Sequence, residues 1–192
     1  MTVVEERFPE RVEKRVMIGK VPSERFEVVG AESSLTFFAM STMQYVYGKT
    51  TELSGFIDVG WNPDGTLAVQ PPPKMHVEFR VESLRTGNEL QDREMWKLID
   101  SKRFPKIAAD LRDASAGAAL GRYTGTGQIT LAGLARAYEG EFRLEREPKK
   151  VTLHGDLNVD VRDFGLKPLN LLVLSVAPLV RVRLQLVTAK VV

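Results

Sequence analysis

The stretch Val151–Val161, VTLHGDLNVDV, decides the fold class of this protein. Apolar or small residues occupy every second position, and polar residues occupy the positions between them. Successive side chains of a strand point to opposite faces, so this alternation predicts a long strand with one buried face and one wet face. The same alternation recurs in Met75–Val81, Tyr138–Leu144 and Val180–Leu186.

Weaker strand signals and one helix complete the pattern. The helix is expected over Glu89–Ser101, where Met95, Trp96 and Ile99 stand among charged neighbours. The weaker strands are expected at Leu35–Tyr47, Thr51–Val59, Thr66–Val69, Ile107–Leu111, Tyr123–Leu131 and Leu171–Val176. Roughly eight to ten antiparallel strands with one inserted helix favour a closed barrel or a sandwich, and periodicity alone does not choose between them.

Composition limits the domain organisation and the partners. The chain has 192 residues, 43% of them hydrophobic and 27% charged, with a net charge of +2 and no Cys. This predicts one domain over residues 21–192, preceded by a charged arm or short helix over residues 1–20, and nucleic acid is not an expected partner. The first residues form no apolar run after a basic start, so the expected location is the cytoplasm.

The residues that usually carry catalysis are scarce. His76 and His154 are the only histidines, both fall on polar strand faces, and no Gly-x-Ser-x-Gly motif accompanies them. His154 and Asp156 share a strand face, but they do not supply a convergent ligand set for a transition metal. The sequence therefore predicts no enzyme activity, no metal site and no cofactor.

Four glycines fall in the apolar register of their strands. They are Gly125, Gly127, Gly140 and Gly155. Each glycine alone is consistent with a bulge or a coiled strand, because glycine tolerates tight bends and close approach. Together they also fit an interior cavity, since missing side chains leave empty volume where a barrel would otherwise hold branched bulk. Such a cavity suits a long apolar ligand.

Several short motifs, in order, resemble the YceI-like polyisoprenoid-binding family from about Arg25 to the carboxyl end. They are Glu32–Phe37 (ESSLTF), Leu53–Phe56 (LSGF), Val81–Asn88 (VESLRTGN), Phe104–Ile107 (FPKI), Gly127–Gly133 (GQITLAG) and Arg162–Gly165 (RDFG). The resemblance implies an antiparallel lipocalin-like barrel of about eight strands, with one short helix beside an opening and an isoprenoid or quinone-like chain inside. A homodimer and transient contact with a membrane would both fit such a protein.

We expect thirteen residues to line the ligand site, with core packing as the alternative for the three on the helix. They are Phe37, Phe56, Phe79, Met95, Trp96, Ile99, Tyr123, Gly125, Gly127, Ile129, Phe142, Leu157 and Phe164. The leading hypothesis is a non-catalytic lipid carrier or store. The alternatives are a filled barrel that acts as a protein-interaction module and, third, an enzyme that acts on a prenyl lipid.

Overall fold

The fold was analysed in a computed structural model, which describes residues 21–168, 170–171 and 174–191. The predicted arm over residues 1–20 lies outside the described residues. The strands and helices are β1 (Ser23–Val28), η1 (Gly30–Glu32), β2 (Ser34–Ser41), β3 (Tyr45–Thr50), β4 (Ser54–Gly60), β5 (Lys74–Arg80), η2 (Val81–Ser83), α1 (Glu89–Ile99), β6 (Lys106–Ala116), β7 (Arg122–Leu131), β8 (Leu134–Glu147), β9 (Lys150–Asp160), η3 (Val161–Phe164), β10 (Asn170–Leu171) and β11 (Leu174–Lys190).

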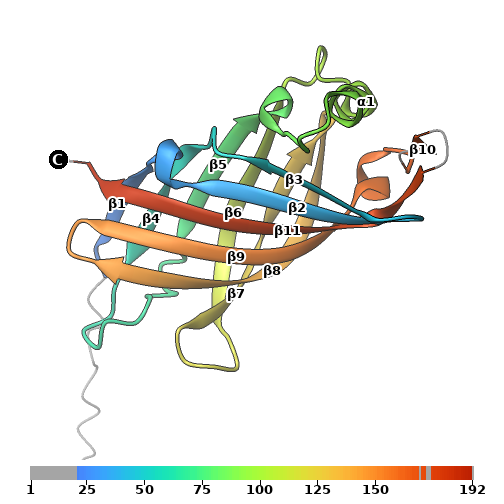
Figure 1. The fold of residues 1–192 in the computed structure, drawn as a ribbon. Coiled ribbons are helices and arrows are strands. Elements are labelled where there is room, and N and C mark those ends of the chain that lie inside the picture. The colour runs from blue at the N-terminus through green and yellow to red at the C-terminus, as the bar shows by residue number, and fades with distance from the viewer. Residues whose placement is uncertain (1–20, 169, 172–173, 192) are drawn as a thin grey trace, which may run out of the picture.

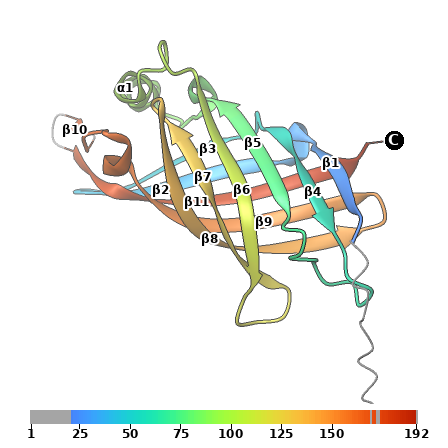
Figure 2. The ribbon, with the colours of Figure 1, turned by 180° about the vertical axis from the view of Figure 1, so that it is seen from behind.

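The strands form a closed antiparallel barrel. The ring runs β1-β4-β5-β6-β7-β8-β9-β11, and pairing of Phe26 with Lys190 returns β11 to β1. This confirms the predicted eight-stranded barrel and rules out the sandwich. At the other end of β11 the neighbour is β2, which carries β3 on its outer edge. Figures 1 and 2 place α1 and β10 at one end of the barrel and the end of β11 at the other.

Two strand predictions were wrong in detail. Leu35–Tyr47 was expected to be one strand, but it spans the hairpin of β2 and β3. Thr66–Val69 was expected to be a strand, yet only Leu67 makes a bridge, to Trp61 across the turn that Asn62 and Thr66 close. β1 was not predicted, because its buried Phe26 stands almost alone among polar neighbours.

The helix α1 agrees closely with the predicted Glu89–Ser101. The Asn88 side chain accepts hydrogen bonds from the backbone amides of Leu90 and Gln91, which satisfies two of the free donors at the helix start. The helix ends at Asp100, which adopts a left-handed backbone with φ of 60°. No helix among the described residues is long and apolar enough to cross a bilayer.

Side chains fill one end of the barrel. Phe26, Ile57 and Leu186 are almost fully buried there, and the ring of Tyr123 stacks on Phe142 at 5.4 Å between centroids. The Tyr123 hydroxyl accepts a hydrogen bond from the Leu67 amide at 3.1 Å, so its polar atom is satisfied inside the core. This filled end closes the barrel interior on one side, and the remaining interior lies between it and α1.

Candidate functional site

An apolar cavity occupies the barrel interior between the filled end and α1. Its volume is about 300 Å³. Phe142, Leu111 and Leu153 lie at its floor, and Thr86, which precedes α1, and Gln91, in the first turn of α1, lie at its mouth. The walls come from the inward positions of the strands, in the register that the alternation of the sequence predicts.

The charged residues that border this cavity direct their carboxylates to the outer face. The Asp110 carboxylate lies 2.7 Å from Nδ1 of His76 on the outer face. Asp156 accepts hydrogen bonds from Arg181 on the outer face, and Gln128 accepts one from Arg112. A charged ligand group would find no opposite charge inside, because the cavity is otherwise apolar. The arrangement suits an uncharged hydrocarbon chain.

Tyr138 contributes a hydroxyl group to the cavity wall, and this hydroxyl is already engaged. It donates a hydrogen bond to the Asp163 carboxylate at 2.6 Å and accepts one from the Asp160 amide at 3.2 Å. Burial, and then the bond to Asp163, raises the pKa of Tyr138 to about 12. Its ring stacks on Phe164 at 5.9 Å, so Tyr138 presents an uncharged aromatic surface to the cavity.

Three of the four inward glycines meet where the filled end gives way to the cavity. Gly125 of β7 pairs with Gly140 of β8, and Gly155 of β9 pairs with Phe142. A Cβ atom at Gly155 would meet only side chains at 3.6 Å or more, which is ordinary contact. The absence of a side chain at Gly155 therefore leaves room in the cavity.

The fourth glycine, Gly127, is required for a different reason. A Cβ atom at Gly127 would lie 2.0 Å from the carbonyl oxygen of Asp110, so the two backbones approach too closely for any other residue. The pairing of β6 with β7 shifts register just beyond, between Leu111 and Asp113. Gly127 is thus a bulge glycine, which was the alternative that the sequence left open.

Nine of the thirteen predicted residues border the cavity. They are Phe37, Phe79, Met95, Ile99, Gly125, Gly127, Ile129, Phe142 and Leu157. They come from β2, β5, α1, β7, β8 and β9, so the barrel closure brings together positions that are far apart in the sequence. Their contact with a ligand stays a prediction.

Phe56 and Trp96 were expected at the site and lie elsewhere. Phe56 alternates with the buried Ile57, so it faces outward, where the Arg25 guanidinium covers its ring at 3.9 Å. Trp96 faces the loop before α1, and its Nε1 donates a hydrogen bond to the Leu84 carbonyl at 3.2 Å. Its role is to hold α1 to that loop.

Tyr123 and Phe164 are also separated from the cavity. Tyr123 points inward, but it lies below Phe142 in the filled end. Phe164 is buried in η3 behind Tyr138, which stands between it and the cavity. Strand alternation distinguishes inward from outward positions and does not give the depth of a residue along the barrel.

The lining also includes residues that the sequence reasoning did not select. Examples from each part of the wall are Leu35, Ala39, Val46, Met75, Val182 and Leu184. The sequence pattern does indicate Val182 and Leu184 as inward residues, because both fall on the apolar face of a predicted strand. Ala39 and Val46 belong to the β2–β3 hairpin, where apolar residues occur on both faces and hide the alternation.

The two histidines lie outside the cavity, on the outer face. His76 is bound to Asp110, and Nε2 of His154 lies 3.3 Å from the Glu145 carboxylate. In the part of the chain that the structure describes, no three His, Asp or Glu side chains gather in a way that could hold a metal ion.

A closed antiparallel barrel with an apolar interior cavity and a helix beside its mouth defines the class of protein. Within that class, the chain belongs to the family of the YceI-like domain, whose model matches residues 26–188. No match was found among the curated proteins.

Solved structures with the same fold come from several bacteria. BcnA of Burkholderia cenocepacia is 18% identical with a TM-score of 0.69, and the match covers 83% of this chain and 98% of BcnA. A polyisoprenoid-binding domain from Saccharophagus degradans is 15% identical with a TM-score of 0.65, covering 86% and 98%. The YceI protein of Campylobacter jejuni is 13% identical with a TM-score of 0.62, covering 79% and 88%.

Proposed function

We propose that this protein binds an uncharged apolar chain, of the isoprenoid or quinone-tail kind, inside the barrel and carries or stores it without catalysis. The observation that carries the proposal is the cavity of about 300 Å³, whose wall is predominantly apolar between Phe142 and Gln91. Its volume lies at the low end of the ~300–1,000 Å³ usual for ligand pockets, which suits one hydrocarbon chain.

Two further observations support the proposal. The chain belongs to the YceI-like family, and a similar solved structure is described as a polyisoprenoid-binding domain. The alternative of a filled barrel requires a solid interior, whereas a cavity of about 300 Å³ occupies the part of the barrel beside α1. An enzyme on a prenyl lipid requires a reactive polar group at the ligand, and the hydroxyl of Tyr138 is taken by Asp163. A cytoplasmic location and a homodimer stay predictions.

The first experiment is extraction of the gently purified protein with organic solvent, followed by mass spectrometry. A neutral lipid with a long apolar chain is expected in a stoichiometric amount. An extract without lipid, together with no binding of added isoprenols or fatty acids, would refute the proposal.

A variant pair tests whether the cavity holds the lipid. Gly155→Leu adds a side chain that reaches into the cavity without a backbone clash, since the nearest atoms to a Cβ there are side-chain carbons at 3.6 and 3.8 Å. It is expected to fold and to lose the lipid, because the added bulk replaces it. Gly155→Ala is the matched control and should retain it. Gly125 is less suitable, because a Cβ there would lie 2.6 Å from Leu111. If Gly155→Leu keeps the lipid in full, the lipid lies elsewhere.

A further inference from the structure

The β2–β3 hairpin carries exposed apolar side chains on the outer side of the cavity wall. Ala39 and Val46 pair across the hairpin and line the cavity. The next pair, Met40 and Tyr45, points the other way and is exposed, with 74% of Tyr45 accessible. This hairpin therefore has two apolar faces, whereas β8 and β9 have a charged outer face.

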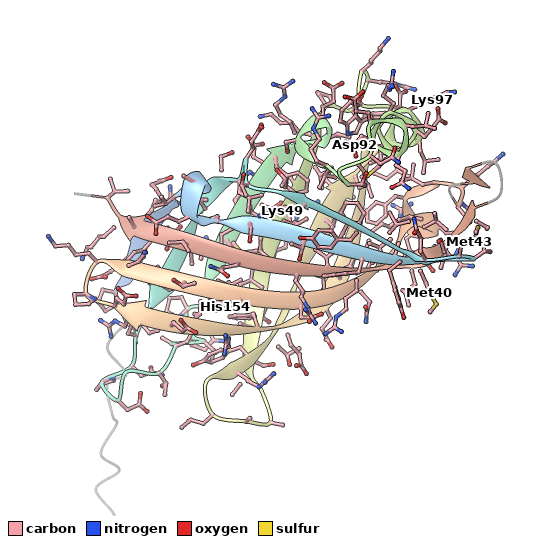
Figure 3. The ribbon with its side chains drawn as sticks, viewed as in Figure 1. Met40, Met43, Lys49, Asp92, Lys97 and His154 are labelled. Carbon is pink, nitrogen blue, oxygen red and sulfur yellow. The ribbon has the colours of Figure 1, made fainter. Side chains whose placement is uncertain are left out.

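We define the rim patch as the exposed apolar side chains at this edge of the mouth. They are Met40, Met43, Tyr45, Tyr47 and Leu179. Leu179 joins the hairpin residues because it precedes Val180, the partner of Ala39 in β11. The Thr42 amide donates a hydrogen bond to the Ser175 carbonyl at 3.1 Å, which ties the hairpin to β11. Figure 3 places Met40 and Met43 at the end of the hairpin, far from His154.

The rim patch lacks charge in a protein that is otherwise rich in it. No charged residue occurs between Phe37 and Gly48, or between Pro168 and Val180, although 27% of the chain is charged. Tyr and Met at such a tip match the side chains that settle at the interface of a bilayer, where a flexible or amphipathic apolar group can enter.

We propose that the rim patch docks this protein onto the surface of a lipid bilayer, so that the apolar chain passes between the membrane and the cavity beside β2 and β3. The inference rests on the proposed function, because a cavity that holds an apolar chain must exchange it without exposing it to water. The rim patch lies directly outside the cavity wall, because Val46, which lines the cavity, and Tyr45, which is exposed, are adjacent in β3.

A bilayer fits this surface better than a second copy of the chain does. A stable protein interface takes roughly 20–30 residues on each side, whereas the rim patch consists of five side chains on the β2–β3 hairpin and the adjoining part of β11. Shallow insertion into a bilayer needs only a small patch of this kind. The hairpin itself carries no charged residue between Phe37 and Gly48. The cations beside it are Arg181, which pairs with Phe38 across β11 and β2, and Arg183, which lies 5.4 Å from the Phe38 ring. Both are paired with Asp156, so we infer apolar insertion and not attraction to anionic headgroups.

The first test is flotation of the full chain with phosphatidylcholine vesicles. The protein should float with the vesicles at both low and high salt. Met43→Glu and Tyr45→Glu should each lower the partition coefficient roughly tenfold, because a carboxylate opposes insertion. Leu120→Glu is the matched control, since Leu120 is 96% exposed in the loop between β6 and β7, at the end of these strands away from α1. Docking is refuted if the rim variants float like the unchanged protein, or if Leu120→Glu lowers flotation as much.

The second test separates docking from ligand binding. All-trans-retinol, a fluorescent isoprenoid, is loaded into the protein, and its transfer to the vesicles is timed. The rim variants should bind retinol with unchanged affinity and transfer it roughly tenfold more slowly, in proportion to their lost partitioning. Failure to bind retinol or any added isoprenol would count against the proposed function, while flotation still tests docking. If the unchanged protein is a dimer in sedimentation and the rim variants are monomers, the rim patch joins two copies and the proposal is overturned.

Discussion

The two ends of the barrel interior are packed differently. At the filled end, Phe26, Ile57 and Leu186 exclude solvent and leave no room. At the hollow end, Gly155 of β9 leaves open the space that a side chain would otherwise occupy, and a cavity of about 300 Å³ lies there. The boundary is sharp, because Tyr123 and Gly125 are only two positions apart on one face of β7. Because the filled end supplies a packed core, the other end of the barrel can stay hollow and hold a ligand.

The two ends also differ in how they are held together. The filled end depends on burial of apolar surface, whereas α1 at the hollow end combines burial of Ile99 with polar contacts. Asp92 is buried and accepts hydrogen bonds from the amide and hydroxyl of Thr86 at 2.7 and 2.8 Å. The Arg85 guanidinium lies 4.4 Å above the Trp96 ring. Because α1 is held by fewer buried apolar side chains than the filled end is, we expect the mouth to be the end where the structure opens.

The largest expected effect comes from truncating matched leucines at the two ends. Leu186→Ala should lower the free energy of unfolding by about 2 to 5 kcal/mol, because it opens a new void in a filled core. Leu157→Ala should cost less, since Leu157 already borders empty space and loses fewer contacts. Denaturant unfolding of both variants without ligand measures the difference. Equal losses would mean that the two ends are packed alike.

A smaller effect is expected from releasing α1. Asp92→Ala removes the acceptor of the Thr86 amide and should lower the free energy of unfolding by about 1 to 3 kcal/mol, the cost of a buried donor left without a partner. Hydrogen exchange of the Thr86 amide should become faster, and loss of bound lipid should speed up with it. Asp92→Asn is the control, because the amide oxygen can still accept one bond. Unchanged exchange in Asp92→Ala would show that this contact does not hold the helix.

How much of the fold could be predicted from the sequence depended on whether a strand has a polar outer face. Strands with charged outer faces, such as Val151–Val161, were found by alternation, and the barrel followed from them. The sequence predicts one strand for the β2–β3 hairpin because its apolar residues lie on both faces and hide the alternation. The same feature gives the hairpin one apolar face toward the cavity and another toward the outside. Gly155 and Gly127 have the same sequence signal, yet only the distances from a Cβ distinguish open space from a close backbone contact.

Depth along the barrel was the other property that the sequence could not supply. Tyr123 and Phe142 are inward, aromatic and paired across β7 and β8. Only Phe142 reaches the cavity, because Tyr123 lies one layer further into the filled end. Such layering depends on how the strands tilt and close, which is a property of the whole ring and not of one strand.

The smallest expected change in stability comes from an ion pair on the outer face, at the boundary between the filled and the hollow end. Asp156 lies beside Gly155 and accepts two hydrogen bonds from Arg181, at 2.9 and 2.6 Å. The hydrogen bond and charge of Arg181 hold the pKa of Asp156 below its usual value. A lowered folded-state pKa means that the stabilisation is complete above the unfolded-state pKa of about 3.9 and is lost as the pH falls through the lower folded-state value.

Asp156→Asn tests this pair. At neutral pH it should lower the free energy of unfolding by no more than about 1 kcal/mol, because the pair is partly exposed and screened by solvent. The difference from the unchanged protein should vanish when the pH is lowered below the folded-state pKa, and it should shrink in high salt. The measurement is the free energy of unfolding of both proteins at several pH values. A loss that persists in acid would come from packing at the boundary, next to Gly155, and would mean that the two ends are coupled through this face as well as through the interior.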